Sequence, residues 1–131
     1  MKKLQTGFTL IELIVVIVIL GILAVTALPK FIDMRADAQL ASVQGVAGAA
    51  TSAMNLNFAG CSLTNNVVTA NKCVAVSACA DTASLLQGGL PAGYTVAGSG
   101  AAMTAVNGST ANCSVTSGGV SAVFAAISSG N

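Results

Sequence analysis

The sequence predicts an α+β fold in which one long amino-terminal helix packs on a small antiparallel β-sheet that disulfides stabilise. The helix is indicated by residues 9–58, which are first apolar on all sides and then apolar along one stripe. The sheet is indicated by alternating segments after Pro91, which Asn107-Gly108 and Gly118-Gly119 separate. Four cysteines in a chain of 131 residues indicate disulfides. In such a fold each layer covers the apolar face of the other.

An apolar run over residues 8–28 forms the first half of the expected helix. At about 1.5 Å per residue this run spans about 30 Å, the thickness of the hydrocarbon core of a bilayer. One carboxylate, Glu12, interrupts it. A charged side chain at the centre of a membrane segment costs about 2.5–3.5 kcal/mol and usually persists where it meets a partner charge. We therefore expect Glu12 to have a partner.

The expected partner of Glu12 is a new amino group. No Lys, Arg or His occurs between Lys3 and Lys30, so the apolar run itself offers no cation. Cleavage after Gly7 would release the amine of Phe8, one helical turn before Glu12. In a bundle of such helices, the Phe8 amine of a neighbouring copy could reach the same carboxylate.

The residues around this carboxylate form a recognisable motif. The short basic leader Met-Lys-Lys-Leu-Gln-Thr-Gly followed by Phe-Thr-Leu-Ile-Glu-Leu resembles the class III signal of type IV pilins and of the related type II secretion pseudopilins. The resemblance implies that a membrane-bound prepilin peptidase cleaves between Gly7 and Phe8 and N-methylates Phe8. It also implies that Glu12 acts in assembly, and that the α+β fold is the ladle-shaped pilin fold.

Two simpler interpretations compete with this one. Lys2 and Lys3 before an apolar core are also typical of an ordinary secretory signal, with a small-residue cleavage site before Leu28. The other interpretation is a plain single-pass membrane anchor. A charge at the head of the apolar core and an amphipathic continuation beyond Pro29 argue against removal of the whole segment, and a plain anchor gives no reason for Glu12.

Two residues weaken the expected helix. Pro29 lacks a backbone N–H and disfavours helical geometry in the preceding residue, so we expect a kink or a local loosening near Leu28. Gly21 is a second weak point. Both match the pilin family, whose filaments are often described with the helix partly melted between such residues. The resemblance therefore implies that Gly21 and Pro29 are assembly positions.

Beyond Pro29 the expected helix becomes amphipathic. One apolar stripe, at steps of three and four residues, is expected to pack on the sheet. Gly45 and Gly48 each cost up to about 1 kcal/mol of helix propensity relative to alanine, so this half depends on tertiary packing. The helix is expected to stop at Ala59-Gly60, where glycine suits a carboxyl-terminal cap. The members of the stripe are Ile32, Ala36, Leu40, Val43, Ala47, Ala50 and Met54.

The composition argues against catalysis and against nucleic-acid binding. Charged residues make up 7% of the chain and histidine is absent, which removes the commonest general base and the commonest metal ligand. Once the leader is removed, three cationic side chains stand against four acidic ones, so there is no basic field for nucleic acid. We therefore expect no enzyme activity, no cofactor and no metal.

Four cysteines behind an export signal indicate two disulfides formed outside the cytoplasm, and they allow three pairings. We favour Cys61 with Cys73, which closes a local loop. We favour Cys79 with Cys113, which joins residues 61–79 to a strand and restricts the unfolded chain by about 3–4 kcal/mol. Zinc binding and redox catalysis are disfavoured because the chain contains no Cys-x-x-Cys pair.

Turn residues and alternation predict the remaining elements. Residues 61–79 form a polar surface connection. Asp81 is then expected to cap a short helix that Gly88 ends, with Leu85 and Leu86 buried. A meander of three or four strands is expected over residues 94–97, 102–106, 112–116 and 120–127, with hairpin turns at the two glycine-containing pairs named above.

Part of this second half resembles one branch of the pilin family more closely. The strings Gly-Gly-Leu-Pro-Ala-Gly-Tyr-Thr-Val at residues 88–96 and Cys-Ser-Val-Thr from Cys113, together with Phe124 in the last strand, resemble the mannose-sensitive haemagglutinin branch of type IV (type IVa) pilins.

The resemblance implies a structural subunit of a type IV pilus. Such a subunit is inserted in the inner membrane, cut by prepilin peptidase and passed to the pilus assembly machinery. It then polymerises with copies of itself into an extracellular filament for adhesion, motility or surface attachment. The expected division is a leader over residues 1–7, a transmembrane and assembly half of the helix over 8–29, an amphipathic half over 30–60 and a globular part over 61–131.

Two alternatives stay open. A major pseudopilin of a type II secretion system has the same amino terminus. Four cysteines and the lack of an acidic cluster near the carboxyl terminus disfavour it, since major pseudopilins usually hold calcium there. A monomeric, membrane-anchored surface binding domain needs only the anchor.

Overall fold

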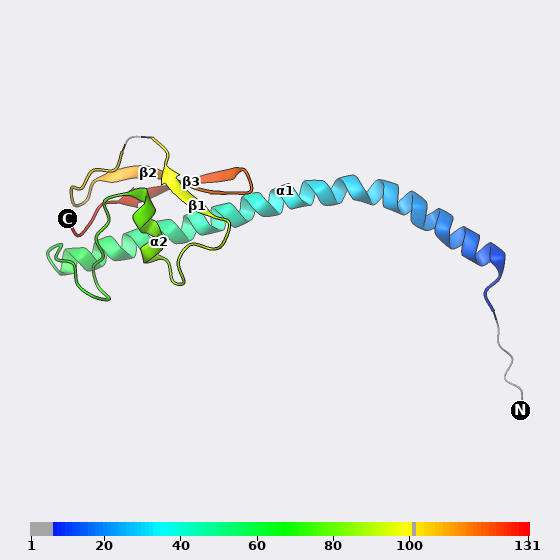
Figure 1. Ribbon diagram of the computed structural model, residues 1–131, viewed down its shortest axis with the longest axis horizontal. Coiled ribbons are helices and arrows are strands. Elements are labelled where there is room, and N and C mark those ends of the chain that lie inside the picture. Colours follow the sequence, from blue (N-terminus) through cyan, green and yellow to red (C-terminus); the bar gives the residue numbers. More distant parts are fainter. Residues whose placement is uncertain (1–6, 101) are drawn as a thin grey trace, which may run out of the picture. The chain divides into compact units, whose positions relative to one another are not determined.

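The structure is a computed structural model that describes residues 7–100 and 102–131 (Figure 1). The expected leader falls outside these residues except for Gly7. The helices are α1 (Leu10–Leu63), the 3-10 helix η1 (Cys79–Asp81) and α2 (Thr82–Leu85). The strands are β1 (Thr95–Gly98), β2 (Thr110–Ser117) and β3 (Val120–Ile127). The chain divides into two compact units, Met1–Asp37 and Ala38–Asn131, each described by itself.

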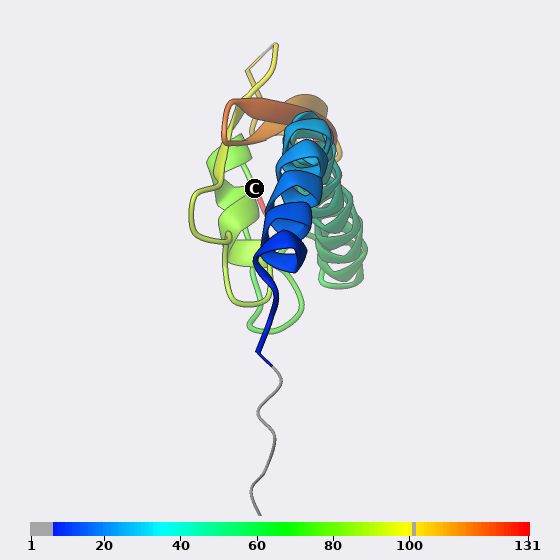
Figure 2. The same cartoon turned by 90° about the vertical axis from the view of Figure 1, so that its right-hand side faces the viewer.

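In the unit Ala38–Asn131, α1 packs on a three-stranded antiparallel sheet, which confirms the predicted architecture. Figures 1 and 2 show the sheet along one side of this part of the helix, with η1 and α2 beside it. Small and medium-sized side chains fill the space between the helix and the sheet. Those of α1 are Val43, Ala47, Ala50 and Met54, and those of β2 and β3 are Cys113, Val115, Phe124 and Ala126.

The apolar stripe of α1 is buried only from Val43 onward. Leu40 is 41% exposed, so the prediction that the stripe is packed at this residue is wrong. Ala36 belongs to the other unit, and its packing on the sheet stays a prediction. At the tip of the β2–β3 hairpin, Gln39 Nε2 donates to Ser117 Oγ (3.2 Å). The side chain of Ile32 lies outside what the structure describes.

The sheet has the strand order β1-β2-β3, with both neighbouring pairs antiparallel. Gly118 and Gly119 join β2 to β3, and their φ angles of 57° and 80° place both in the left-handed region that a two-residue hairpin requires. The hairpin predicted at this position is therefore confirmed. In the register that it sets, Cys113 lies opposite Phe124 on the buried face.

Residues 102–106 do not form a strand, and Asn107-Gly108 is not a hairpin turn, so both predictions are wrong. These residues belong to the loop between β1 and β2. The Gly108 N–H donates to Ser128 O (2.8 Å), and the Asn107 side chain bonds both backbone groups of Asn131. The loop is thus bound to the segment after β3, and β1 takes the place beside β2 that the predicted strand would have filled.

The helix predicted from Asp81 is shorter than expected, and Asp81 does not cap it as predicted. Its carboxylate accepts the N–H groups of Ser77 (2.8 Å) and Ala78 (2.9 Å), so it caps the preceding turn, η1. The regular helix α2 then ends at Leu85. Leu85 and Leu86 are half-buried rather than buried because this short helix has only one side against the core.

The long helix α1 continues past the predicted stop at Gly60 and ends at Leu63. Gly60 is required for another reason, since a Cβ at this position would clash with the carbonyl oxygen of Lys72. The residue that terminates the helix is Asn65, which lies two positions beyond Leu63 and has a left-handed φ of 51°. The Asn66 N–H donates to Cys61 O at 2.7 Å. This is the long bond of a Schellman-type cap, with asparagine in the position that glycine usually holds.

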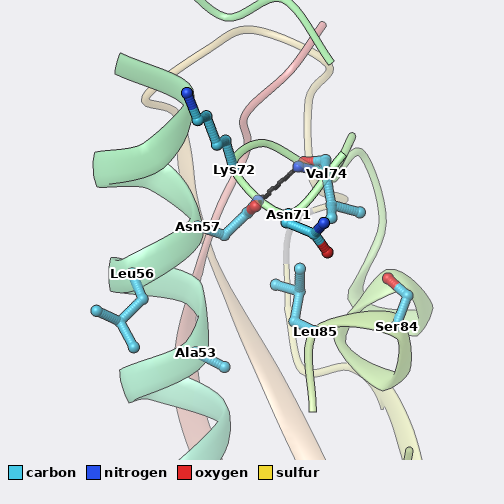
Figure 3. A pocket seen from close by; sticks show the side chains of 8 residues that line it. All are labelled: Ala53, Leu56, Asn57, Asn71, Lys72, Val74, Ser84 and Leu85. Carbon is cyan, nitrogen blue, oxygen red and sulfur yellow. Dashed lines mark hydrogen bonds between the residues drawn. The ribbon is translucent and has the colours of Figure 1, made fainter. Parts of the chain in front are cut away.

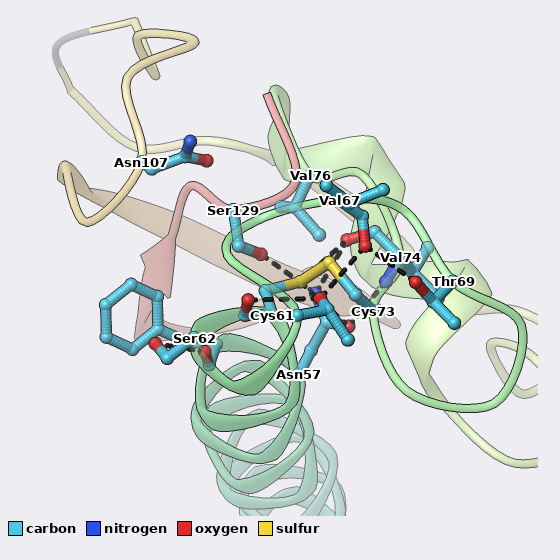
Figure 4. Close-up of a disulfide and its surroundings, with 12 residues drawn as sticks. Asn57, Cys61, Ser62, Val67, Thr69, Cys73, Val74, Val76, Asn107 and Ser129 are labelled. Carbon is cyan, nitrogen blue, oxygen red and sulfur yellow. Dashed lines mark hydrogen bonds between the residues drawn. A yellow bond between two sulfur atoms is a disulfide. The ribbon is translucent and has the colours of Figure 1, made fainter.

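The structure pairs Cys61 with Cys73 and Cys79 with Cys113, the pairing favoured from the sequence. The first disulfide binds the end of α1 to the following loop, and Asn57 lies beside it (Figure 4). Asn57 Nδ2 donates to Val74 O (2.8 Å) and to Ser129 Oγ (2.9 Å), while its Oδ1 accepts the Val74 N–H (2.9 Å). One buried amide therefore fixes both the loop and the segment after β3 to the helix.

A hollow of about 290 Å³ lies next to Asn57, between α1, the loop at residues 71–74 and α2 (Figure 3). The Asn57 side chain points to Val74 and is occupied by the bonds just described. Lys72 extends away from the Ser84 and Leu85 side chains in the same view. The hollow is therefore lined by groups that serve the fold. Its lining residues are Ala53, Leu56, Asn57, Asn71, Lys72, Val74, Ser84 and Leu85.

The close contact at Gly60 is tested by Gly60→Ala. We expect the free energy of unfolding to fall by about 1–3 kcal/mol, the usual cost of overpacking, because the added Cβ meets backbone rather than a flexible side chain. Urea unfolding of the full chain in mild detergent measures it. Gly48→Ala is the matched control, because its Cβ meets nothing within 4 Å and it should gain up to about 1 kcal/mol of helix propensity. Equal changes in the two variants would contradict the contact.

The role of Asn57 is tested by Asn57→Ala. Three hydrogen bonds are lost, each worth about 0.5–1.5 kcal/mol net, so the free energy of unfolding should fall by about 1.5–4.5 kcal/mol. Asn55→Ala changes an exposed asparagine of the same helix and should stay within about 0.5 kcal/mol of the unchanged protein. The same urea titration compares them, and an Asn57→Ala protein as stable as the control would exclude this role.

Candidate assembly site

The amino terminus of α1 is built as a capping box. Thr9 precedes the first helical residue, and its Oγ1 accepts the Glu12 N–H at 3.4 Å. In return, Glu12 Oε2 accepts the Thr9 N–H at 2.8 Å. The Thr9 hydroxyl also donates to the same Oε2 at 2.8 Å. The side chains of residues 9 and 12 thus satisfy backbone donors that the first turn of a helix leaves without partners.

The capping box gives Glu12 a partner that the sequence analysis missed. The sequence carried a signal for it, since Thr-x-x-Glu before an apolar run is the pattern of a capping box. Both Thr9 donors reach the same oxygen, Oε2. Among the described residues, Oε1 receives no hydrogen bond, so one oxygen of the carboxylate is available to a further donor.

Phe8 lies next to this carboxylate and is 89% exposed. A shallow groove of about 390 Å³ lies along the same stretch, lined by Phe8, Ile11, Glu12, Val15 and Val16. The carboxylate therefore lies in an otherwise apolar groove. Such a groove suits a ligand that is largely apolar and carries one hydrogen-bond donor or positive charge.

The apolar run has no cover in its own unit. Large apolar side chains from Leu10 to Leu28 range from 42% exposed at Ile14 to 75% at Leu10. The helix that carries them is long and apolar enough to cross a membrane by length and composition. A contiguous exposed apolar surface of this extent indicates a membrane or protein partner. This surface is the second component of the site.

Gly21 and Pro29 lie further along the same helix. Gly21 opens a notch bounded by Ile17, Val18, Ile22, Val25 and Thr26, because nothing lies within 4 Å of the position that a Cβ would take. The helix is continuous through Pro29. The kink or local loosening expected near Leu28 stays a prediction. The missing Pro29 N–H removes one helical bond, and the bonds on either side maintain the helix.

The structure thus brings Gly7, Phe8 and Glu12 together with Thr9 at the start of α1. The cysteines belong to the other unit. The chemistry available at the start of α1 is the acceptance of a donor by Glu12 and the burial of apolar surface. This chemistry suits contact with an apolar partner that carries a hydrogen-bond donor.

A model of a known protein family matches the amino-terminal segment of the chain. Residues 2–28 match the family model described as the prokaryotic N-terminal methylation motif. This range includes Gly7, Phe8, Glu12 and Gly21, which the sequence analysis assigned to processing and assembly, and it ends one residue before Pro29.

The curated relatives that match part of the chain are named as type IV pilins or as a fimbrial protein. The chain is 60% identical over 40 residues to the type IV major pilin protein PilE1 of Neisseria gonorrhoeae, which is 30% of this chain and 24% of the relative. It is 53% identical over 47 residues to the type IV narrow pilus major component PilA5 of Thermus thermophilus, covering 36% of this chain and 40% of the relative. It is 50% identical over 48 residues to the fimbrial protein EcpC of Eikenella corrodens, covering 37% and 31%.

These matches show that part of the chain is similar to type IV pilins. The chain covers between about a quarter and two fifths of the length of these relatives. No solved structure matches the chain significantly. The unit Ala38–Asn131 therefore has to be understood from its own structure.

The capping box is tested by Thr9→Val, which keeps the shape of the side chain and removes its oxygen. Loss of the cap should cost the first turns about 1 kcal/mol, so amide hydrogens of residues 13–16 should exchange about fivefold faster. Nuclear magnetic resonance of the full chain in detergent micelles measures this exchange. Thr9→Ser keeps the oxygen and serves as the control. Identical exchange in both variants would rule out the cap.

Proposed function

We propose that this chain is the structural subunit of a type IV pilus. It polymerises through its amino-terminal helix into an extracellular filament that serves adhesion, motility or surface attachment. The observation that carries the proposal is the exposed apolar helix that follows Gly7-Phe8. Its first turn holds the carboxylate of Glu12 in a capping box with Thr9. The pilins named above are similar to part of the chain, and residues 2–28 match the N-terminal methylation motif.

The proposed assembly contact is between Glu12 and a terminal amine. Cleavage between Gly7 and Phe8 converts the Phe8 nitrogen into a cation. In our proposal Glu12 keeps its Thr9 bonds on Oε2, and its Oε1 accepts the Phe8 amine of a neighbouring copy. Charge then sets the register of two helices, while their apolar side chains bury one another. The contact joins different surfaces of the two copies, and such contacts give a fibre when they do not close into a ring.

The proposed route begins in the inner membrane. Residues 8–29 hold the precursor there, prepilin peptidase removes residues 1–7 and N-methylates Phe8, and the assembly machinery passes the subunit into the filament. Gly21 and Pro29 act in this model as the positions where the helix adapts during assembly. Residues 30–60 form the amphipathic half of the helix, and residues 61–131 form the globular part. Two disulfides in this last part fit an oxidising compartment outside the cytoplasm.

We further propose that the chain belongs to the mannose-sensitive haemagglutinin branch of type IVa pilins. The support is the string at residues 88–96, Cys113 with its neighbours, and Phe124 in the last strand. In the structure, Cys113 and Phe124 lie opposite each other in the core, so this part of the resemblance involves residues that position the sheet on the helix.

The ion pair is tested by two variants of Glu12. Glu12→Ala removes the charge and the cap, whereas Glu12→Gln keeps an acceptor for Thr9 and removes only the charge. Because the proposed pair needs the charge, both variants should reduce sheared surface filaments at least about tenfold, the equivalent of about 1.4 kcal/mol, with the subunit still present in the membrane. Immunoblots of sheared and membrane fractions measure this.

The two variants separate the possible roles. Normal filaments in Glu12→Gln would exclude the ion pair and leave the cap as the role of Glu12. Normal surface function in Glu12→Ala would favour a monomeric anchored domain, and short polymers confined to the envelope would favour a pseudopilin. Mass spectrometry of sheared material provides the second test, since the mature chain should begin with a methylated Phe8. Any other first residue contradicts the proposed processing.

A further inference from the structure

Asn107 is the only asparagine of the chain that a glycine follows. Asparagine is a thermolabile residue, because the backbone nitrogen of the next residue can attack its side-chain carbonyl carbon and release ammonia. Glycine at the next position has no Cβ to obstruct this attack. Asn107 and Gly108 are both exposed, so water and hydroxide reach them. The sequence and the exposure therefore make Asn107 a candidate for spontaneous modification.

The fold holds both reacting groups in hydrogen bonds to the segment after β3. The Gly108 N–H donates to Ser128 O at 2.8 Å. Asn107 Nδ2 donates to Asn131 O at 2.7 Å, and Asn107 Oδ1 accepts the Asn131 N–H at 3.0 Å. For the attack, the Gly108 nitrogen has to lose its proton and turn to the Asn107 side chain, which breaks the bond to Ser128. Residues 128–131 therefore compete directly with the reaction.

This segment is anchored to Val76, away from Asn107. Ser129 and Val76 exchange two backbone hydrogen bonds, of 2.8 Å and 3.2 Å. Ser128 Oγ donates to Val76 O at 2.9 Å, and Asn131 Nδ2 donates to the same oxygen at 2.9 Å and to Ser128 Oγ at 2.8 Å. Ser128 and Ser129 are buried, whereas Asn131 is exposed. Local opening is easiest where backbone bonds are exposed and few buried contacts exist, so the segment opens first at Asn131.

We propose that Asn107 is a site of spontaneous deamidation whose rate is controlled by residues 128–131. When the segment opens, the Gly108 nitrogen gives its proton to hydroxide and attacks Cγ of Asn107. The bond from Cγ to Nδ2 breaks, Nδ2 takes a proton from water and leaves as ammonia, and a cyclic succinimide remains. Water then opens the ring at either carbonyl and gives aspartate or isoaspartate. Water is the only reactant from outside the chain.

The product cannot restore the original contact. An ionised carboxylate has no hydrogen to donate to Asn131 O, and it places a negative charge beside that carbonyl oxygen. Isoaspartate also lengthens the backbone before Gly108 by one methylene. The unit Ala38–Asn131 contains one cationic and one anionic side chain, Lys72 and Asp81, so the reaction adds a second negative charge. One opening of the segment is thereby converted into a permanent loss of its attachment to residues 107–109.

This inference goes beyond the proposed function. The reaction involves neither Phe8 nor Glu12, and it requires neither cleavage of the chain nor polymerisation. Every contact that controls it lies within the unit Ala38–Asn131. The proposal can therefore fail while the proposed function holds, and the reverse is equally possible.

The test uses Asn131→Ala in the full chain in detergent micelles. This change removes the side chain that anchors the segment and keeps the backbone groups that bind Asn107. The open fraction should rise by about twofold to tenfold, the factor that one net hydrogen bond contributes to an equilibrium. Hydrogen exchange and deamidation both begin with loss of the Gly108 proton in the open form, so both rates should rise by the same factor.

Two measurements follow these rates. Nuclear magnetic resonance measures hydrogen exchange at Gly108. Mass spectrometry measures the labelled oxygen that residue 107 gains in isotopically labelled water. Asn112→Ala is the matched control, because it removes an exposed asparagine of β2 and should leave both rates unchanged. Asn107→Gln keeps the amide but does not readily form the succinimide ring, so it should gain no label. Intact native disulfides confirm folding in each variant.

The reduced chain, unfolded in urea, gives the rate without protection by the segment. We expect this rate to be many-fold higher than the rate in the folded chain, because the segment is closed most of the time in the folded chain. Equal rates in the folded and unfolded chains would overturn the proposal. So would an unchanged deamidation rate in Asn131→Ala, or the absence of label at residue 107 in the unfolded chain.

Discussion

The rest of this molecule depends on an apolar helix surface that its own unit leaves uncovered. From Leu10 to Leu28 the side chains are exposed, so the free energy of burying them is available only to a membrane or to other molecules. Glu12 interrupts this surface, and the capping box with Thr9 satisfies part of its hydrogen-bonding capacity within the first turn. The helix can therefore enter an apolar environment with its carboxylate partly satisfied and one oxygen free for a donor from outside.

The unit Ala38–Asn131 has a core of mostly small side chains and needs further stabilising contacts. Its core is built largely from alanine, valine and cysteine, so packing alone contributes little per residue. Three features stabilise the unit in addition to core packing. The disulfides attach the loop to α1 and to β2, Asn57 binds the loop and the segment after β3, and Gly60 lets the Lys72 carbonyl approach the helix closely. Each of them joins a segment outside the long helix and the strands to α1 or to β2.

The sequence predicted those parts of the structure that local patterns determine. The helix spacing identified Val43 to Met54 as the buried stripe, and Gly118-Gly119 identified the hairpin. The favoured cysteine pairing is also the pairing in the structure. At the site, the sequence singled out Gly7, Phe8 and Glu12 and missed Thr9, although its Thr-x-x-Glu signal was present.

The errors share a physical cause, which is that tertiary contacts outweighed local preference. Asn107-Gly108 has hairpin chemistry, yet Gly108 bonds to Ser128, far along the chain. Gly60 suits a helix cap, yet it is used for close approach to Lys72. Asp81 suits the start of a helix, yet its carboxylate bonds to the backbone behind it. None of these partners is visible in a short window of sequence.

The scarcity of charge in Ala38–Asn131 has a consequence for the way this unit meets its surroundings. Hydroxyl and amide groups of serine, threonine and asparagine supply most of its polar surface. Ionic screening acts on charges, so changes in salinity leave the forces at such a surface almost unaltered. Water binds this surface through hydrogen bonds, and contacts made there should have the same strength at low and at high salt concentration.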